Sequence, residues 1–78
     1  MTPNEIKQLI TVGLPECEVS VSSDDNTHFD AVVICTAFAG KRPLQRHQMV
    51  YRTLGDLMGG EIHALSIQAL TPDEQIGS

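Results

Sequence analysis

The chain has 78 residues, no tryptophan, one tyrosine and two phenylalanines, and its five Lys or Arg against ten Asp or Glu leave a net charge of −5. This length predicts one domain over residues 1–78 with a small aliphatic core, because a chain of this size hides only about 60–65% of its unfolded surface. An apolar content of 41% excludes a disordered chain, and the longest apolar run, at residues 31–35, is too short to cross a bilayer.

The first half of the chain predicts a helix followed by a β-hairpin. Thr2 and Glu5 have the spacing of a capping box around Pro3, and apolar residues then recur at helical spacing up to Gly13. Alternation over residues 16–22 predicts a half-buried strand. A polar turn then leads into a β-branched strand, whose run of apolar residues indicates a central position in the sheet.

The second half predicts a long helix, a third strand and a short last helix. Pro43 begins the helix, which is expected to run to about Met58 and to end at two glycines. Alternation over residues 62–70 predicts the strand, and Thr71 with Glu74 repeats the capping-box spacing. The residues expected to face inward from the long helix are Leu44, His47, Tyr51, Leu54 and Met58. The fold class is therefore α+β, in the order α-β-β-α-β, with a three-stranded sheet and the helices on one face.

The two cysteines, Cys17 and Cys35, each fall in a predicted strand. One disulfide between them is compatible with the sequence, but free cysteines in strands more often act as small buried hydrophobic residues, which is the interpretation that we favour. The first residues lack the basic segment and apolar stretch of a signal peptide, so we expect a cytoplasmic protein with reduced thiols.

Four of the five cationic side chains fall between residues 41 and 52. On an acidic chain such a segment predicts a localised docking surface, either for an acidic partner or for nucleic-acid phosphates. The alternative is a solvated helix face with no partner. The candidate partner-binding or nucleic-acid-binding residues are Lys41, Arg42, Arg46 and Arg52.

Each of the three histidines has an ordinary and a functional interpretation. His47 is predicted to be structural, packing on the inward face with one internal hydrogen bond, or else to join the cationic surface. His63 begins a strand and His28 follows an acidic turn, where an imidazole is either solvated or available as a metal ligand. A metal held there needs ligands from another molecule, because the chain has no close ligand pairs of the structural-zinc type. No catalytic motif is present, so we predict that the protein is not an enzyme.

Two stretches of the chain resemble the BolA family. One is Phe-x-Gly-Lys-x-x-x-x-Arg-His-x-x-Val-Tyr at residues 38–51, and the other is Ile-His-Ala-Leu at residues 62–65, followed by Thr-Pro-x-Glu. The resemblance covers essentially the whole chain. Because the chain is short and acidic, it is similar to the bacterial IbaG branch of the family. It implies a fold like that of a type II KH domain, in agreement with the predicted order.

The resemblance also implies a function. Members pair with a monothiol glutaredoxin in a heterodimer and share a 2Fe–2S cluster, for iron–sulfur maturation, trafficking or iron homeostasis. The glutaredoxin supplies a cysteine together with a glutathione thiolate, and the positions that match the BolA-side ligands are His63 and His28. Because ligation requires neutral imidazole, cluster loss is expected on acidification between roughly pH 7 and 5.5.

An alternative within the same family is a KH-like DNA-binding regulator of stress or envelope genes. KH domains hold nucleic acid with a Gly-x-x-Gly loop. The matching segment at residues 40–43 lacks the second glycine and has Pro43, which offers no backbone donor. We therefore expect any DNA binding to be weak and sensitive to salt.

Overall fold

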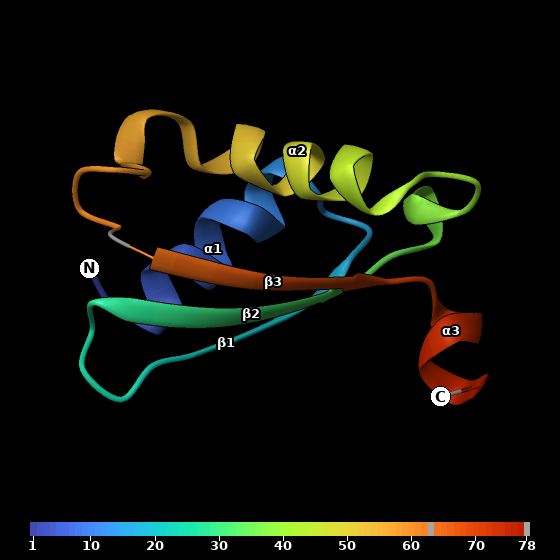
Figure 1. Cartoon of the computed structure of the whole chain (residues 1–78), viewed down its shortest axis with the longest axis horizontal. Helices are drawn as coiled ribbons and strands as arrows, with labels where there is room; N and C mark the ends of the chain where they lie inside the picture. The colour runs from blue at the N-terminus through green and yellow to red at the C-terminus, as the bar shows by residue number, and fades with distance from the viewer. Residues whose placement is uncertain (63, 78) are drawn as a thin grey trace.

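The computed structural model describes residues 1–62 and 64–77, with side chains up to residue 75. Two helices, α1 and α2, cover one face of a three-stranded sheet, and a short helix, α3, follows the last strand at the end of the sheet (Figure 1). The predicted order of elements is confirmed. The elements are α1 Pro3–Gly13, β1 Glu18–Ser22, β2 His28–Ile34, a 3-10 turn at Thr36–Phe38, α2 Pro43–Leu54, a 3-10 turn at Gly55–Leu57, β3 Ala64–Leu70 and α3 Pro72–Gly77.

The sheet is mixed, with β2 in the centre as predicted. β1 and β2 form the predicted antiparallel hairpin, in a register that pairs Glu18 with Ile34. β3 lies parallel to β2 and pairs His28 with Ala64 at one end and Ile34 with Leu70 at the other. This parallel pairing follows from the connection through α2, because parallel neighbours need a long crossover that is usually helical.

Both predicted capping boxes are present. In α1 the Thr2 hydroxyl accepts from the Glu5 backbone N–H at 3.3 Å, while the Glu5 carboxylate accepts from the Thr2 N–H at 3.1 Å. In α3 the Thr71 hydroxyl and the Glu74 carboxylate make the same reciprocal pair, at 3.2 and 2.9 Å. These boxes satisfy N–H groups that the first turn of a helix leaves without partners.

The prediction that α2 runs to Met58 was wrong. The helix ends at Leu54, because Gly55 adopts φ 57° and ψ −129°, a conformation that residues with a side chain rarely adopt. The chain then makes a 3-10 turn.

The predicted inward face was also wrong at Leu44 and Tyr51, whereas Leu54 is buried and Met58, beyond the end of the helix, packs half-buried against the core. The buried positions of the helix are Arg46, Val50 and Leu54, whereas Leu44 is 69% exposed and Tyr51 is 37% exposed. The pattern favoured the apolar stripe, but the helix turns Arg46 inward instead. His47 is half-buried, and its side chain makes no hydrogen bond within the described part of the chain.

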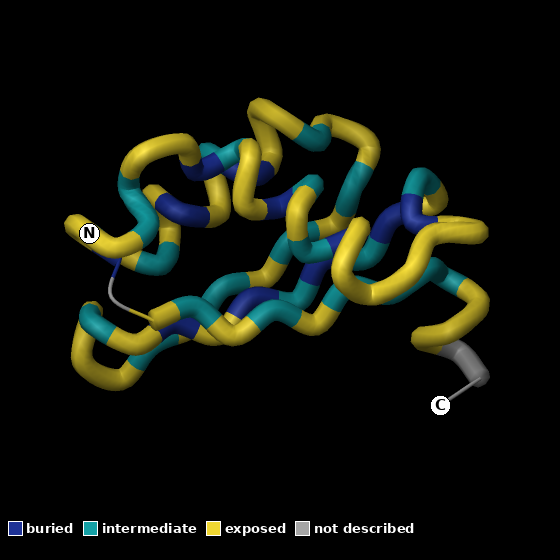
Figure 2. The backbone as a smooth tube through the Cα atoms, turned by 45° about the horizontal axis from the view of Figure 1, so that its top comes forward, coloured by how far each residue is buried: buried dark blue, intermediate teal, exposed yellow. Residues whose placement is uncertain are grey.

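The core lies between the sheet and the two long helices (Figure 2). It is aliphatic with two phenylalanines, and its fully buried side chains include Ile6, Ile10, Phe29, Val33, Phe38, Val50 and Ile62. α1 and α2 approach closely at Gly13, where an added Cβ atom would lie 2.5 Å from Thr53 Cγ2. A glycine is therefore needed at this contact.

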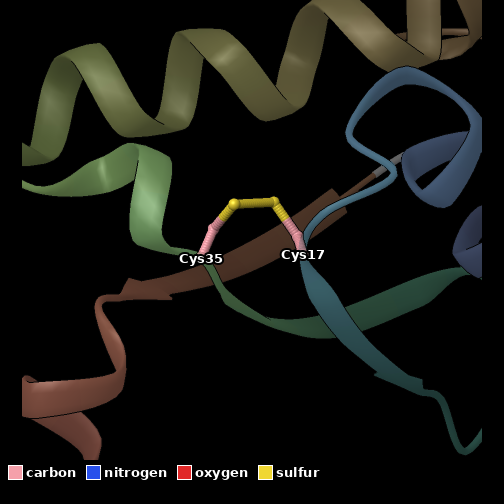
Figure 3. The surroundings of a disulfide bond; sticks show 2 residues. All are labelled: Cys17 and Cys35. Carbon is pink, nitrogen blue, oxygen red and sulfur yellow. A yellow bond between two sulfur atoms is a disulfide. The ribbon is translucent and has the colours of Figure 1, made fainter.

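Cys17 and Cys35 form a disulfide (Figure 3), so the favoured interpretation as free buried cysteines is corrected. The reason is the hairpin register. Glu18 of β1 pairs with Ile34 of β2, so residues 17 and 35, which lie just outside this pair, face each other across the hairpin. Their Cα atoms are 4.4 Å apart. Within residues 1–62 and 64–77, no helix has the length and apolar character needed to span a membrane.

Candidate functional site

The turn between β1 and β2 is held together by its own short polar side chains. Asp25 Oδ1 accepts from the backbone N–H groups of Thr27 and His28, both at 2.9 Å. Ser23 Oγ accepts from the Asn26 N–H at 2.9 Å and donates to the His28 carbonyl at 2.6 Å. Asn26 has φ 57°, a left-handed conformation that asparagine tolerates better than most residues. These hydrogen bonds therefore hold the backbone of the turn, and with it the position of His28, in one defined conformation.

Asp25 also orients the side chain of His28. Its Oδ2 lies 3.0 Å from His28 Nδ1, and the His28 side chain is 71% exposed. The pKa of Asp25 lies well below its usual range, because the His28 backbone N–H, the His28 ring and the Thr27 N–H all donate to its carboxylate.

An ionised carboxylate can only accept hydrogen bonds, so Nδ1 of His28 is the donor in this contact. In the neutral imidazole the other nitrogen, Nε2, then keeps its lone pair. Histidines that bind metals usually donate their second ring nitrogen to a carboxylate or carbonyl in this way, which fixes the tautomer and raises the basicity of the ligating nitrogen. The donor set at His28 therefore fits a metal ligand.

The other predicted ligand, His63, lies outside the described residues. The residue that follows it, Ala64, begins β3 and pairs with His28 across the sheet. We call this end of the sheet, defined by Asp25, His28 and Ala64, the turn end. No group of three or more His, Cys, Asp or Glu side chains that could hold a metal is found in the described part of the chain.

At the opposite end of the sheet, Arg46 is buried and only 8% exposed. Its Nε donates to the Lys41 carbonyl at 2.9 Å, and Nη1 donates to the Ala69 carbonyl at 3.0 Å. Nη1 and Nη2 reach the two carboxylate oxygens of Glu74 at 2.6 and 3.2 Å. The guanidinium also lies 5.8 Å from the ring centre of Phe38, within the range of a cation–π contact.

Glu74 thus has two functions, because the carboxylate that pairs with Arg46 also caps α3. The Arg46 side chain and then the Thr71 N–H lower the pKa of Glu74 to about 2. We call this end, defined by Cys17, Cys35, Arg46 and Glu74, the clamp end. The structure therefore places Arg46 inside the molecule and not on the exposed surface predicted for it.

The other three predicted cations are exposed, but they do not form one patch. Lys41 and Arg42 lie just before α2, and Arg52 lies near the end of that helix. Arg52 lies ten positions after Arg42, which is about 15 Å along the helix axis. Arg46 Nε donates to the Lys41 carbonyl, so the buried arginine anchors the backbone at the first of the two exposed cations that precede the helix.

Sequence reasoning missed Asp25 and the pairing of Arg46 with Glu74. Asp25 lies three residues before His28 in a polar turn, a spacing at which an aspartate commonly accepts from nearby backbone N–H groups, so a local signal was present. The contact of Arg46 joins residues 28 positions apart and had no local signal.

The order α-β-β-α-β with a mixed sheet defines a small α+β domain. A family model described as BolA-like protein matches residues 15–74, and the chain therefore belongs to the BolA family. A solved structure of a BolA protein homologue from Coxiella burnetii has a TM-score of 0.86 and 47% identity, with 97% of each chain covered.

Curated relatives match over part of their length. BolA-like protein 1 of Homo sapiens is 45% identical over 53 residues, which are 68% of this chain and 39% of that protein. A protein of Vibrio cholerae named DNA-binding transcriptional regulator BolA is 40% identical over 55 residues, which are 70% of this chain and 52% of that protein. The matches therefore span 39% and 52% of the lengths of these two relatives.

Proposed function

We propose that this protein is a non-enzymatic, cytoplasmic adaptor that binds a monothiol glutaredoxin and shares a 2Fe–2S cluster with it. The role would serve iron–sulfur maturation, trafficking or iron homeostasis. One observation carries the proposal: Asp25 binds Nδ1 of His28, and Nε2 has no partner in the described part of the chain, on an exposed side chain at the turn end. Membership of the BolA family supports the class of partner.

The chain would contribute half of the coordination sphere. His28 and His63 would be its ligands, and β3 begins directly after His63, opposite His28. The partner would contribute a glutaredoxin cysteine and a glutathione thiolate. Two neutral imidazoles in place of two thiolates raise the reduction potential of such a cluster, as in Rieske centres.

We further propose that the chain belongs to the IbaG-like branch of the family, with a histidine as the hairpin ligand. The turn offers His28 and contains no cysteine, since Cys17 precedes β1 and Cys35 follows β2. Both cysteines also lie at the clamp end and are joined to each other. The ligand type at the hairpin is therefore imidazole in this proposal.

The test is to mix the full chain with a monothiol glutaredoxin, glutathione, iron and sulfide. We expect a coloured heterodimer whose visible spectrum differs from that of the glutaredoxin alone. His63→Ala and His28→Ala should each remove this difference while leaving the far-UV circular dichroism unchanged. His47→Ala is the matched control, because this half-buried histidine lies on α2 and should leave the spectrum as it is. A wild-type spectrum from His63→Ala would contradict the proposal.

The second candidate function is DNA binding by a transcriptional regulator. The similarity to the Vibrio cholerae protein of that name favours it, as do the exposed cations Lys41 and Arg42 beside the start of α2. If both side chains contact phosphates, the double variant Lys41→Gln with Arg42→Gln should have a shallower slope of log affinity against log salt concentration. The decrease should correspond to the loss of about two phosphate contacts. Lys7→Gln, on α1, is the control for loss of charge alone. An unchanged slope in the double variant would remove these cations from a DNA interface.

A further inference from the structure

The two cysteines of the disulfide differ in how deeply they are buried. Cys35 is buried in the core and is 1% exposed. Cys17 is half-buried and borders an open cavity of about 580 Å³, which Cys35 does not line. Other residues around this cavity are Lys7, Thr11, Glu18, Val32 and Gln75. A small molecule in the cavity would therefore lie next to Cys17, which is partly buried against the core, and not next to Cys35.

This asymmetry has a chemical consequence. In thiol–disulfide exchange a thiolate attacks one sulfur, forms a mixed disulfide with it and expels the other sulfur. Access decides which sulfur is attacked. We propose that Cys17 is a thiol-exchange and modification site for small-molecule thiols of the glutathione type, and that Cys35 is always the leaving group.

The step is balanced as follows. The thiolate of glutathione forms a bond to Cys17 Sγ, the bond between Cys17 and Cys35 breaks, and Cys35 leaves as a thiolate that takes a proton from water. A second glutathione thiolate then attacks the glutathione sulfur of the mixed disulfide. This releases oxidised glutathione and the Cys17 thiolate, so the two electrons that reduce the protein disulfide come from two glutathione molecules. Oxidised glutathione drives the same steps in reverse.

The surroundings of the two cysteines indicate that their thiols differ in reactivity. Cys35 joins the core cluster with Phe38 and Val50, and its backbone N–H donates to the Leu70 carbonyl at 2.9 Å. A thiol in such apolar surroundings is inert. Among the described residues, Lys7 and Glu18 line the cavity beside Cys17 with opposite charges, and the Lys7 ammonium is the group that attracts an incoming thiolate.

The site lies at the clamp end and needs neither a glutaredoxin nor a cluster. It therefore goes beyond the proposed adaptor function and can fail or hold independently of it. Because both cysteines are joined across the start of β1 and the end of β2, exchange at Cys17 opens this end of the hairpin and leaves the turn end closed.

The test uses the purified full chain in glutathione buffers of increasing oxidised fraction, with acid quenching and peptide mass mapping. We expect one glutathione per chain, on Cys17. The Cys35→Ser variant should be modified on Cys17 about tenfold or more faster than Cys17→Ser is modified on Cys35. In urea both single variants should react at similar rates, which shows that the difference comes from the fold. Equal folded-state rates, or a wild-type adduct on Cys35, would overturn the proposal.

The charge of the cavity is tested by Lys7→Gln. We expect a slower reaction of glutathione with the disulfide and a smaller dependence of its rate on salt. Lys41→Gln is the matched control, because this cation does not line the cavity. A rate equal to the wild type for Lys7→Gln would remove Lys7 from the site.

Discussion

The turn end and the clamp end show how similar polar groups come to serve different purposes. At the turn end, Asp25 satisfies one ring nitrogen of His28, and the other has no partner among the described residues, on an exposed side chain. At the clamp end, all three guanidinium nitrogens of Arg46 donate to protein acceptors, and the side chain is buried. A group can bind a ligand only with atoms that the fold leaves free, so the first end is suited to binding and the second to stability.

Two arginines of the cationic segment show the same contrast over a short distance. Arg42 lies before α2 with an exposed side chain, and its backbone N–H donates to Gln45 Oε1 at 2.9 Å. Arg46, one turn later in α2, is buried and donates to the Ala69 carbonyl of β3 and to the Glu74 carboxylate of α3. Charge in the sequence therefore does not identify a binding residue until burial and partners are known.

The largest effect on stability is expected from opening the disulfide at the clamp end. The linked cysteines are 18 residues apart, and closing a loop of this length stabilises the fold by about 3 kcal/mol in the chain-entropy model. Urea unfolding with and without a reductant measures the difference. Cys17→Ser should be insensitive to the reductant, and the ring resonances of His28 should not move. Equal unfolding curves for the wild type in both conditions would show that the disulfide does not form.

The next largest loss of stability is expected from overpacking the contact between α1 and α2. Gly13→Ala places a Cβ atom within 2.5 Å of Thr53 Cγ2, and overpacking of this kind costs about 1–3 kcal/mol. Adding Thr53→Ser removes the nearest atom and should restore part of the loss in chemical denaturation. Gly60→Ala is the control, because its nearest neighbour would be the Leu57 carbonyl oxygen at 3.8 Å. If Gly13→Ala has wild-type stability, the helices are not in contact there.

A smaller and pH-dependent effect is expected from Glu74→Gln. Arg46 and then the Thr71 N–H lower the pKa of Glu74 from 4.5 to about 2, so the folded state binds this proton less readily than the unfolded state does. The stabilising contribution is complete above about pH 4.5 and is lost as the pH falls toward 2. Thermal melts across this range should show the loss in the wild type and a reduced loss in the variant.

Asp73→Asn is the matched control for Glu74→Gln, because it removes an acidic residue from the same turn of α3 without touching Arg46. Its acid transition should follow that of the wild type. Identical transitions in both variants would argue against the pairing of Arg46 with Glu74.

The smallest effect on stability, with a specific effect on ligation, is expected from Asp25→Asn at the turn end. The amide is uncharged and no longer requires Nδ1 of His28 to be the donor, so nitrogen NMR of the apo chain should show a mixture of tautomers. Loss of such an orienting carboxylate typically lowers metal affinity by about 10–100-fold. Asp24→Asn, the neighbouring acidic residue, should leave both measurements unchanged. A single unchanged tautomer in Asp25→Asn would show that Asp25 does not orient the ring.

Local signals predicted several features that depend on neighbouring residues, although they missed the end of α2 at Gly55. The Thr2 and Thr71 capping boxes, the hairpin and the central β2 strand were all found from spacing of a few residues. The disulfide follows from the hairpin register in the structure, which places residues 17 and 35 opposite one another and which the sequence analysis did not predict. The preference for free cysteines rested on averages and not on that register.

The inward face of α2 could not be read from its own residues. Its apolar stripe indicated one face, whereas burial of Arg46 depends on acceptors from β3 and α3 that come 23 and 28 residues later. The candidate ligands His28 and His63 came from a family resemblance. The tautomer of His28, in contrast, depends on its contact with Asp25, which exists only in the folded turn.

By itself, the sequence determined the order of the elements, their caps, the hairpin and the family, because these depend on residue type and short-range spacing. Only the tertiary structure decided which cation is buried, which cysteine borders a cavity and which histidine nitrogen is left free. Those properties depend on the groups that surround a side chain in space, and a residue's distant neighbours are set by the packing of the whole chain.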